Sequence, residues 1–285
     1  MDSVEDIEVD RELKPQAQGG VGVQSGAYLI ELSPDWIVRR ASENIHRLLG
    51  ESHVTLIGEP LGRFVHSQAL HDLRNLFSRL SGTTGIGRAY AVRLTDDPDL
   101  FDIAFQLSGG RVLLEAVPSS GSFGEAFGTV GGLIAGLADV HGQALLDGAA
   151  RRMRALTGYD RVTLVCGDNR AESSRGGFPA PANMVADLPA IIADSGAETV
   201  PVFPRSTDQA AERALLRSPR QDILTPMASM GIRSSLRVMF NVDDLRGEFR
   251  CGSRTPRKPS FELHAAAELF AQLFAMRLEI DRLKG

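Results

Sequence analysis

Three consecutive runs of the chain alternate apolar and polar side chains, and this alternation constrains the fold more than any other feature. The runs cover residues 88–94, 100–107 and 111–117, and the pair Gly109-Gly110 separates the last two. Alternation with a period of two is typical of half-buried strands. A glycine pair between two such runs favours a tight hairpin turn. The runs therefore predict three antiparallel strands, of which the last two form a hairpin.

An amphipathic helix is predicted just before these strands. Residues 67–80 repeat apolar side chains at the spacing of one helical face. That face carries Leu70, Leu73, Phe77 and Leu80. A helix beside antiparallel strands predicts a small α+β domain over residues 27–120, preceded by an N-terminal segment, 1–26.

The remaining residues, 121–285, predict a second α+β domain. A chain of 285 residues is longer than a typical single core, so about two domains are expected. The first strand-like run of this domain covers residues 157–165, and two later runs form a hairpin around Asp243-Asp244. A helix over Phe261–Leu283 closes the domain.

Long helical stretches flank the second domain on both sides. The first runs over Phe123–Leu156, where an apolar face continues past several glycines. The second, Phe261–Leu283, stays apolar at helical spacing almost to the end of the chain. A helix with an uncovered apolar face needs a partner, so these two stretches predict a homodimer seam. Packing of the first stretch within its own domain is an equal alternative.

Composition argues against several classes of partner. The net charge is −5 and the basic residues are dispersed, which disfavours nucleic acid. No stretch approaches the roughly 20 apolar residues that cross a bilayer, so no membrane association is expected. Cys166 and Cys251 are the whole cysteine complement, which predicts no disulfide framework and favours the reducing cytoplasm.

No constellation of residues predicts catalysis within this chain. The six histidines lack the spacing of a metal site, and the sequence has no nucleophile elbow, phosphate-binding loop or kinase signature. We therefore expect no catalytic residue, no metal and no enzyme activity within these residues.

The segment 216–232 reads LRSPRQDILTPMASMGI and resembles the bilin-pocket segment of bacterial phytochromes. The matching positions are Leu216, Arg217, Ser218, Leu224, Met230 and Gly231. The segment that begins at Ser25 is likewise similar to the opening of a phytochrome PAS domain. The resemblance implies a PAS domain over 27–120 followed by a GAF domain over 121–285, each an antiparallel sheet with flanking helices. It also implies a figure-of-eight knot between them, with Val21 or Val23 as the threaded residue.

The same resemblance implies that the bilin-contacting residues have been replaced. Residues 1–26 contain no attachment cysteine, and Asp222 occupies the alternative attachment position. Ile223 stands at the first pocket histidine, and an aliphatic side chain cannot hydrogen-bond a pyrrole. The other replaced positions are Ala182 for an aspartate, Ser253 for the second histidine, and Pro226 and Val165 for two tyrosines.

Three polar positions of the family pocket remain polar. Arg217 and Ser235 are retained, and Arg237 stands at a neighbouring serine position. The two arginines would suit an anionic ligand, although Arg217 is better explained by pairing with an acidic neighbour.

We therefore expect a phytochrome-like sensory module that binds no bilin and does not photoconvert. It would act through protein contacts and through its helices on a histidine-kinase-type output, either in a longer native chain or in a partner protein. Two alternatives remain: a receptor that holds a non-bilin ligand beside Ile223, Val165 and Arg217, and a photoreceptor that binds bilin without covalent attachment.

Overall fold

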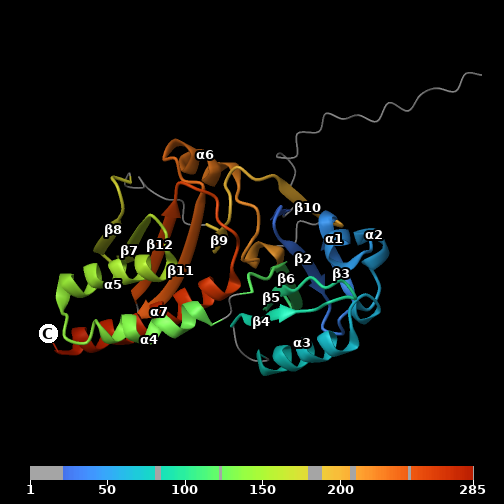
Figure 1. Cartoon of the computed structure of the whole chain (residues 1–285), viewed down its shortest axis with the longest axis horizontal. Helices are drawn as coiled ribbons and strands as arrows, with labels where there is room; N and C mark the ends of the chain where they lie inside the picture. Colours follow the sequence, from blue (N-terminus) through green and yellow to red (C-terminus); the bar gives the residue numbers. More distant parts are fainter. Residues whose placement is uncertain are drawn as a thin grey trace, which may run out of the picture.

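The computed structural model describes residues 22–80, 85–121, 124–178, 188–205, 210–242 and 245–284. These residues form two antiparallel sheets that lie side by side along the molecule, each with helices packed against it (Figure 1). The α+β class expected from the sequence is confirmed.

The first sheet has seven strands in the order β1-β10-β3-β2-β6-β5-β4. Their bounds are β1 Gly22–Gln24, β2 Tyr28–Leu32, β3 Val38–Ser42, β4 Gly87–Val92, β5 Phe101–Ser108, β6 Arg111–Pro118 and β10 Thr199–Phe203. The predicted hairpin is confirmed, because β5 and β6 pair with Ser108 opposite Arg111. Gly109 and Gly110 both have positive φ, 58° and 74°, which is the backbone that a two-residue hairpin turn requires.

Short helices and one longer helix cover this sheet. They are η1 Glu43–Ile45, α1 His46–Leu49, α2 His53–Leu56, η2 Leu61–Arg63 and α3 Ser67–Leu80. Helix α3 has the predicted bounds, and Leu73 of its apolar face is 1% exposed. Phe77 from the same face meets the rings of Trp36 and Phe105, so the helix seals one side of the core.

The second sheet has five strands in the order β8-β7-β12-β11-β9. Their bounds are β7 Arg161–Cys166, β8 Asn169–Ser174, β9 Ile191–Ile192, β11 Ser234–Val242 and β12 Leu245–Ser253. Strands β11 and β12 form the predicted hairpin, and Asp243-Asp244 at its turn lies outside the described residues. On the sheet, Phe240 and Phe249 pack against Phe274 with ring centroids 5.5 Å apart in each case.

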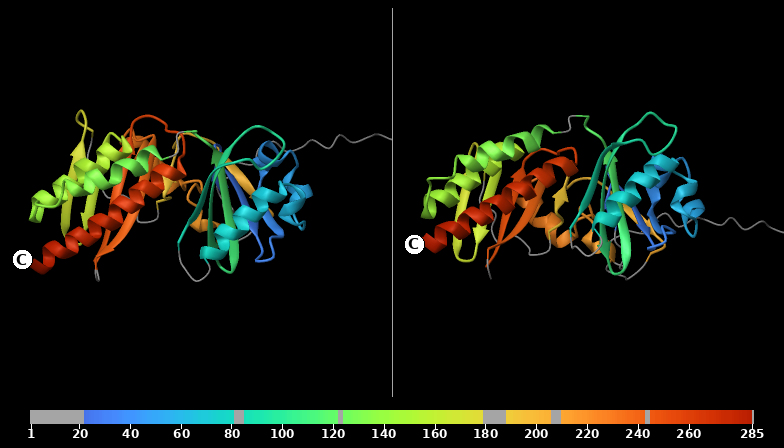
Figure 2. Two further views of the ribbon diagram at one scale, coloured as in Figure 1. Left: turned by 60° about the horizontal axis from the view of Figure 1, so that its bottom comes forward. Right: turned by 90° about the horizontal axis from the view of Figure 1, so that it is seen from below.

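Three helices lie together over one face of this sheet, as the two views of Figure 2 show. They are α4 Glu125–Ala135, α5 Gly142–Thr157 and α7 Phe261–Lys284. The short helices η3 Ala210–Arg213 and α6 Gln221–Ser229 lie elsewhere, with α6 on the opposite face. None of the helices in the described ranges combines the length and apolar character needed to cross a membrane.

The helical stretch predicted over Phe123–Leu156 is interrupted, which corrects the expectation of one continuous apolar face. Helix α4 ends at Ala135 and α5 begins at Gly142, where φ is +56°. The turn between them exposes carbonyl groups that a helix would have used internally. Arg277 of α7 donates hydrogen bonds to three of these carbonyls, those of Val140 (2.7 Å), Leu137 (3.2 Å) and Ala138 (3.2 Å). Phe123 itself lies outside the described residues.

Strand β10 lies within the sequence of the second domain but pairs in the sheet of the first. Its partners are β3 and the N-terminal strand β1. On its other edge β1 bonds to residues 216–218, with Gln24 N donating to Leu216 O and Ser218 N donating to Gly22 O. The N-terminal strand therefore lies between the two limbs of segment 199–218. Val23 is fully buried there, and Val21 lies outside the described residues.

Candidate ligand pocket

The candidate pocket lies between α6 and the face of the second sheet that points away from α5 and α7. Alternation along β7 separates the two faces. Val162 and Leu164 join the core beneath the helices, whereas Arg161 and Thr163 face the pocket. The pocket wall is therefore polar on the strand side, where burial makes each polar group depend on a protein partner.

Apolar side chains fill most of the space between α6 and this wall. The filling residues are Phe178, Leu188, Ile192, Ile223, Met227 and Ile232, all 6% exposed or less. The cavity that remains beside Phe178, Met227 and Ile232 has a volume of about 20 Å³. That volume is close to the space of one water molecule.

The arginines of the strand wall are held in ion pairs. Arg161 pairs with Glu172 and donates from Nη1 to the carbonyl of Phe178 at 3.1 Å. Glu248 lies between Arg237, whose Nε is 2.8 Å from its Oε2, and Arg250. These guanidinium groups therefore already have carboxylate partners in the folded chain.

The replaced positions fall in three different environments. Ile223 is 1% exposed inside the apolar cluster, whereas Asp222, one residue earlier, faces solvent and pairs with Arg220 at 2.9 Å. The hydrogen bond from Arg220 holds the pKa of the Asp222 carboxyl below its usual value. Pro226 and Val165 are half-buried, and Ala182 lies outside the described residues.

Ser253 is buried at the end of β12, where its Oγ accepts a hydrogen bond from the backbone of Asp160 at 3.3 Å. Two residues earlier on the same strand, Cys251 belongs to the core beneath the helices. Burial raises the pKa of the Cys251 thiol to about 12, against a smaller lowering by Thr157. A thiol in that state is a poor nucleophile, so this site offers no reactive cysteine.

The three retained polar positions do not converge on one ligand site. Ser235 lines the small cavity, and its Oγ is buried there. Arg237 is engaged by Glu248 and by the carbonyl of Leu188. Arg217 lies instead beside β1, 4% exposed, with Nη1 3.7 Å from Glu212 Oε2. Glu212 is thus an acidic neighbour of Arg217 in the folded chain.

Sequence reasoning missed the residues that occupy the pocket. Phe178, Leu188 and Ile192 come from a segment that reads as a proline-rich loop, and no local pattern places their side chains against α6. The alternation of Arg161 and Thr163 with Val162 and Leu164 was visible and would have identified the polar wall.

A buried carboxylate connects the pocket segment to the first domain. Glu115 of β6 accepts hydrogen bonds from the backbone N–H groups of Leu215 and Leu216, both at 2.8 Å. Burial raises the pKa of Glu115 to about 7, and these hydrogen bonds limit the rise. The segment that begins the pocket motif is thus anchored by a group that titrates near neutral pH.

Comparison with known proteins identifies the fold. No family model matches the chain, and no curated protein matches it. The chromophore-binding domain of an unusual bacteriophytochrome from R. palustris superimposes with a TM-score of 0.76 at 23% identity, covering 93% of this chain and 97% of that one. The chromophore-binding domain of Stigmatella aurantiaca phytochrome P1 gives 0.72 at 23% identity, covering 90% and 95%.

A longer bacteriophytochrome structure from R. palustris gives a TM-score of 0.78 at 23% identity. This chain spans 60% of its length, and 94% of this chain is covered. The fold is therefore the PAS–GAF fold of phytochrome chromophore-binding domains, as the sequence resemblance implied.

Proposed function

We propose that this chain is a phytochrome-like PAS–GAF sensory module that works without a bilin and signals through protein contacts. The observation that carries this proposal is the apolar cluster around Ile223, which leaves a cavity of about 20 Å³. Pockets for small molecules typically enclose about 300–1,000 Å³. A tetrapyrrole would have to displace several buried side chains of the core, including Phe178 and Met227.

The polar groups near the pocket support the same proposal. A bilin carries propionates, which need free cationic partners. Arg237 is instead paired with Glu248, and Arg217 is directed to Glu212. Breaking the Arg237–Glu248 pair would cost a charge-assisted hydrogen bond between two largely shielded side chains, which is unfavourable.

The two alternative functions considered from the sequence both require a cavity beside Ile223 that is large enough for a ligand. A receptor for another small ligand and a non-covalent bilin photoreceptor would each require the cluster to open. Arg161, Arg237 and Arg250 are each held by a carboxylate in the closed pocket, so we retain the module without a bilin.

Contacts between the domains provide a route for signalling. Arg88 on β4 of the first domain reaches α7 of the second, where its Nη2 lies 2.7 Å from Glu268 Oε2. The Arg88 side chain is only 10% exposed, so this ion pair is better shielded from solvent than a surface pair. A change in the first domain would therefore act directly on α7.

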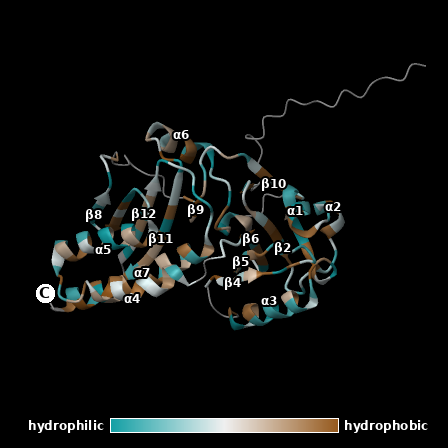
Figure 3. Cartoon of the chain, in the orientation of Figure 1, coloured by the Kyte–Doolittle hydropathy of each residue, from teal (hydrophilic) through white to brown (hydrophobic). Residues whose placement is uncertain are grey.

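Helix α7 supplies the proposed dimer contact. A row of apolar side chains runs along it at separations of four and three residues, as in a coiled-coil seam. The row, here called the α7 stripe, consists of Leu269, Leu273, Met276, Ile280 and Leu283. Four of them are 38–79% exposed, and Figure 3 shows hydrophobic residues recurring along α4 and α7 toward the C-terminal end.

A second copy of the chain suits this stripe, because the four-and-three spacing is complementary to itself. Through the dimer, α7 would pass its state to a histidine-kinase-type output, either in the same polypeptide or in a partner.

Native mass spectrometry of the freshly purified protein tests the proposal. We expect a dimer whose mass equals that of two bare chains. A persistent small-molecule adduct that survives desalting would contradict the closed pocket and favour the receptor alternative. The variant Ile280→Glu should give the bare monomer, which separates the dimer contact from the question of the ligand.

A further inference from the structure

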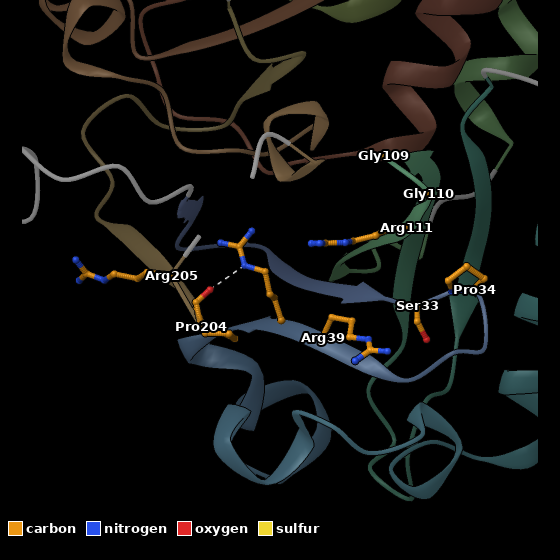
Figure 4. A pocket seen from close by; sticks show the side chains of 9 residues that line it. Ser33, Pro34, Arg39, Gly109, Gly110, Arg111, Pro204 and Arg205 are labelled. Carbon is orange, nitrogen blue, oxygen red and sulfur yellow. Dashed lines mark hydrogen bonds between the residues drawn. The ribbon is translucent and has the colours of Figure 1, made fainter. Parts of the chain in front are cut away.

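A second and much larger cleft lies in the first domain, away from the GAF pocket. Its volume is about 610 Å³, which falls within the range of small-molecule sites. Figure 4 shows Pro204 and Arg205 at one side of the cleft and Gly109, Gly110 and Arg111 at the other, with Arg39 and Ser33 beside them. The residues just after β10 thus face the strands β2, β3 and β6.

The cleft is strongly cationic. The arginines that line it are Arg39, Arg40, Arg111 and Arg205. Glu31 is fully buried and pairs with both Arg40 and Arg111. The residues that line the cleft thus include four arginines and no carboxylate, which favours an anionic ligand.

Arg40 indicates where an anion would bind. Its side chain is 3% exposed, and two of its three nitrogens have acceptors. Nε donates to Pro204 O at 2.9 Å, the bond drawn as a dashed line in Figure 4, and Nη1 lies 3.4 Å from Glu31 Oε2. Nη2 is buried, and the described residues supply no acceptor for it. Buried guanidinium donors are seldom left in that state in a folded protein.

We propose that this cleft binds a phosphate-bearing small molecule. Guanidinium groups match the oxygen geometry of phosphate, to which they donate two parallel hydrogen bonds. A phosphate oxygen beside Arg40 would supply the missing acceptor, while Arg39 and Arg205, both exposed, complete the cation set from the open sides. The ring surfaces of Pro34 and Pro204 offer apolar contacts for the organic part of the ligand.

Binding there would couple the two domains. Arg39, Arg40 and Arg111 belong to the first domain, whereas Pro204 and Arg205 follow β10, which the second domain contributes to the first sheet. A ligand held by both sets would strengthen the junction between β3 and β10. This input is separate from the GAF pocket, so it stands or falls independently of the proposed absence of bilin.

Isothermal titration calorimetry with sodium pyrophosphate at constant ionic strength tests the site. We expect saturable binding of one pyrophosphate per chain. The double variant Arg39→Ala/Arg205→Ala removes exposed cations and keeps the buried pair of Arg40 and Glu31, so it should fold normally. Its affinity for pyrophosphate should fall by about tenfold or more, the effect of losing charge-assisted hydrogen bonds.

Arg79→Ala on α3 is the matched control, because Arg79 is exposed in the same domain and lies outside the cleft. It should bind pyrophosphate as the unmodified chain does. Absence of saturable heat, or an equal loss of affinity in Arg79→Ala, would overturn the proposal. Tighter binding of citrate than of pyrophosphate would overturn the assignment to phosphate.

Discussion

Nη2 of Arg88 lies 2.8 Å from Nδ1 of His264, across the junction between the two domains. A guanidinium can only donate, so Nδ1 must accept and the proton of the imidazole is on Nε2. Nε2–H then donates to the backbone carbonyl of Arg237, the residue whose side chain holds Glu248 beside the pocket. His264 is therefore a neutral, buried link between β4, α7 and β11.

The stability of the chain should depend on the protonation of His264. Burial lowers the pKa of His264 to about 4, Arg88 adds to the lowering, and Glu268 opposes it. An unfolded histidine takes up its proton near pH 6.5, so the folded state loses stability as the pH falls from about 6.5 to about 4. The loss amounts to at most about 3 kcal/mol.

Urea unfolding across this pH range measures the effect against His264→Gln, which keeps one acceptor and one donor but does not titrate. The difference in unfolding free energy between the two proteins should shrink as the pH falls. Parallel pH profiles would show that His264 does not titrate with a lowered pKa.

Glu115 should make the stability of the folded chain depend on pH in the opposite direction. Its pKa is raised to about 7, so the folded state holds a proton that the unfolded chain releases near pH 4.5. This contribution is fully present below about pH 4.5 and is lost as the pH rises through about 7, again with a limit of about 3 kcal/mol. Glu115→Gln cannot ionise and should lack this slope in the same unfolding experiment. If Glu115→Gln retains the full change of unfolding free energy with pH, that change belongs to another group.

The apolar cluster of the pocket should contribute strongly to stability. Met227→Ala and Ile223→Ala should each cost about 2–5 kcal/mol of unfolding free energy, because the surrounding core cannot collapse completely around the lost volume. Thr225→Ala, on the exposed side of the same helix, should change it by less than about 0.5 kcal/mol. Equal effects of all three substitutions would mean that the cluster is not a packed core.

The α7 stripe should hold two copies together. A carboxylate at Met276 or Ile280 would be buried at the seam without a partner, so Met276→Glu or Ile280→Glu should convert the dimer to a monomer in sedimentation equilibrium. Arg79→Glu, an exposed change on α3, serves as the control and should stay dimeric. Dimers that persist in both stripe variants would place the contact elsewhere.

Local patterns predicted the elements whose partners are close in sequence. The hairpin of β5 and β6, helix α3 and helix α7 follow from alternation, helical spacing and one glycine pair. The break between α4 and α5 was missed, because the carbonyls that it exposes are satisfied by Arg277, more than a hundred residues away.

Local sequence patterns likewise did not predict the contacts in the pocket and the cleft that join residues distant in sequence. The motif around Ile223 predicted that a pocket residue had changed, whereas its filling by Phe178 and Leu188 depends on tertiary packing. The arginine cleft joins Arg40 to Pro204 across strand pairing that no sequence pattern encodes.

Whether this chain works without a bilin is tested by the absorption spectrum of the protein after incubation with biliverdin. We expect gel filtration to remove the pigment, and alternating red and far-red light to leave the spectrum unchanged. Ile223→His should behave in the same way, because one imidazole does not create the missing volume. A red-shifted band that stays with the protein and switches reversibly between red and far-red light would show that the chain binds a bilin as a photoreceptor.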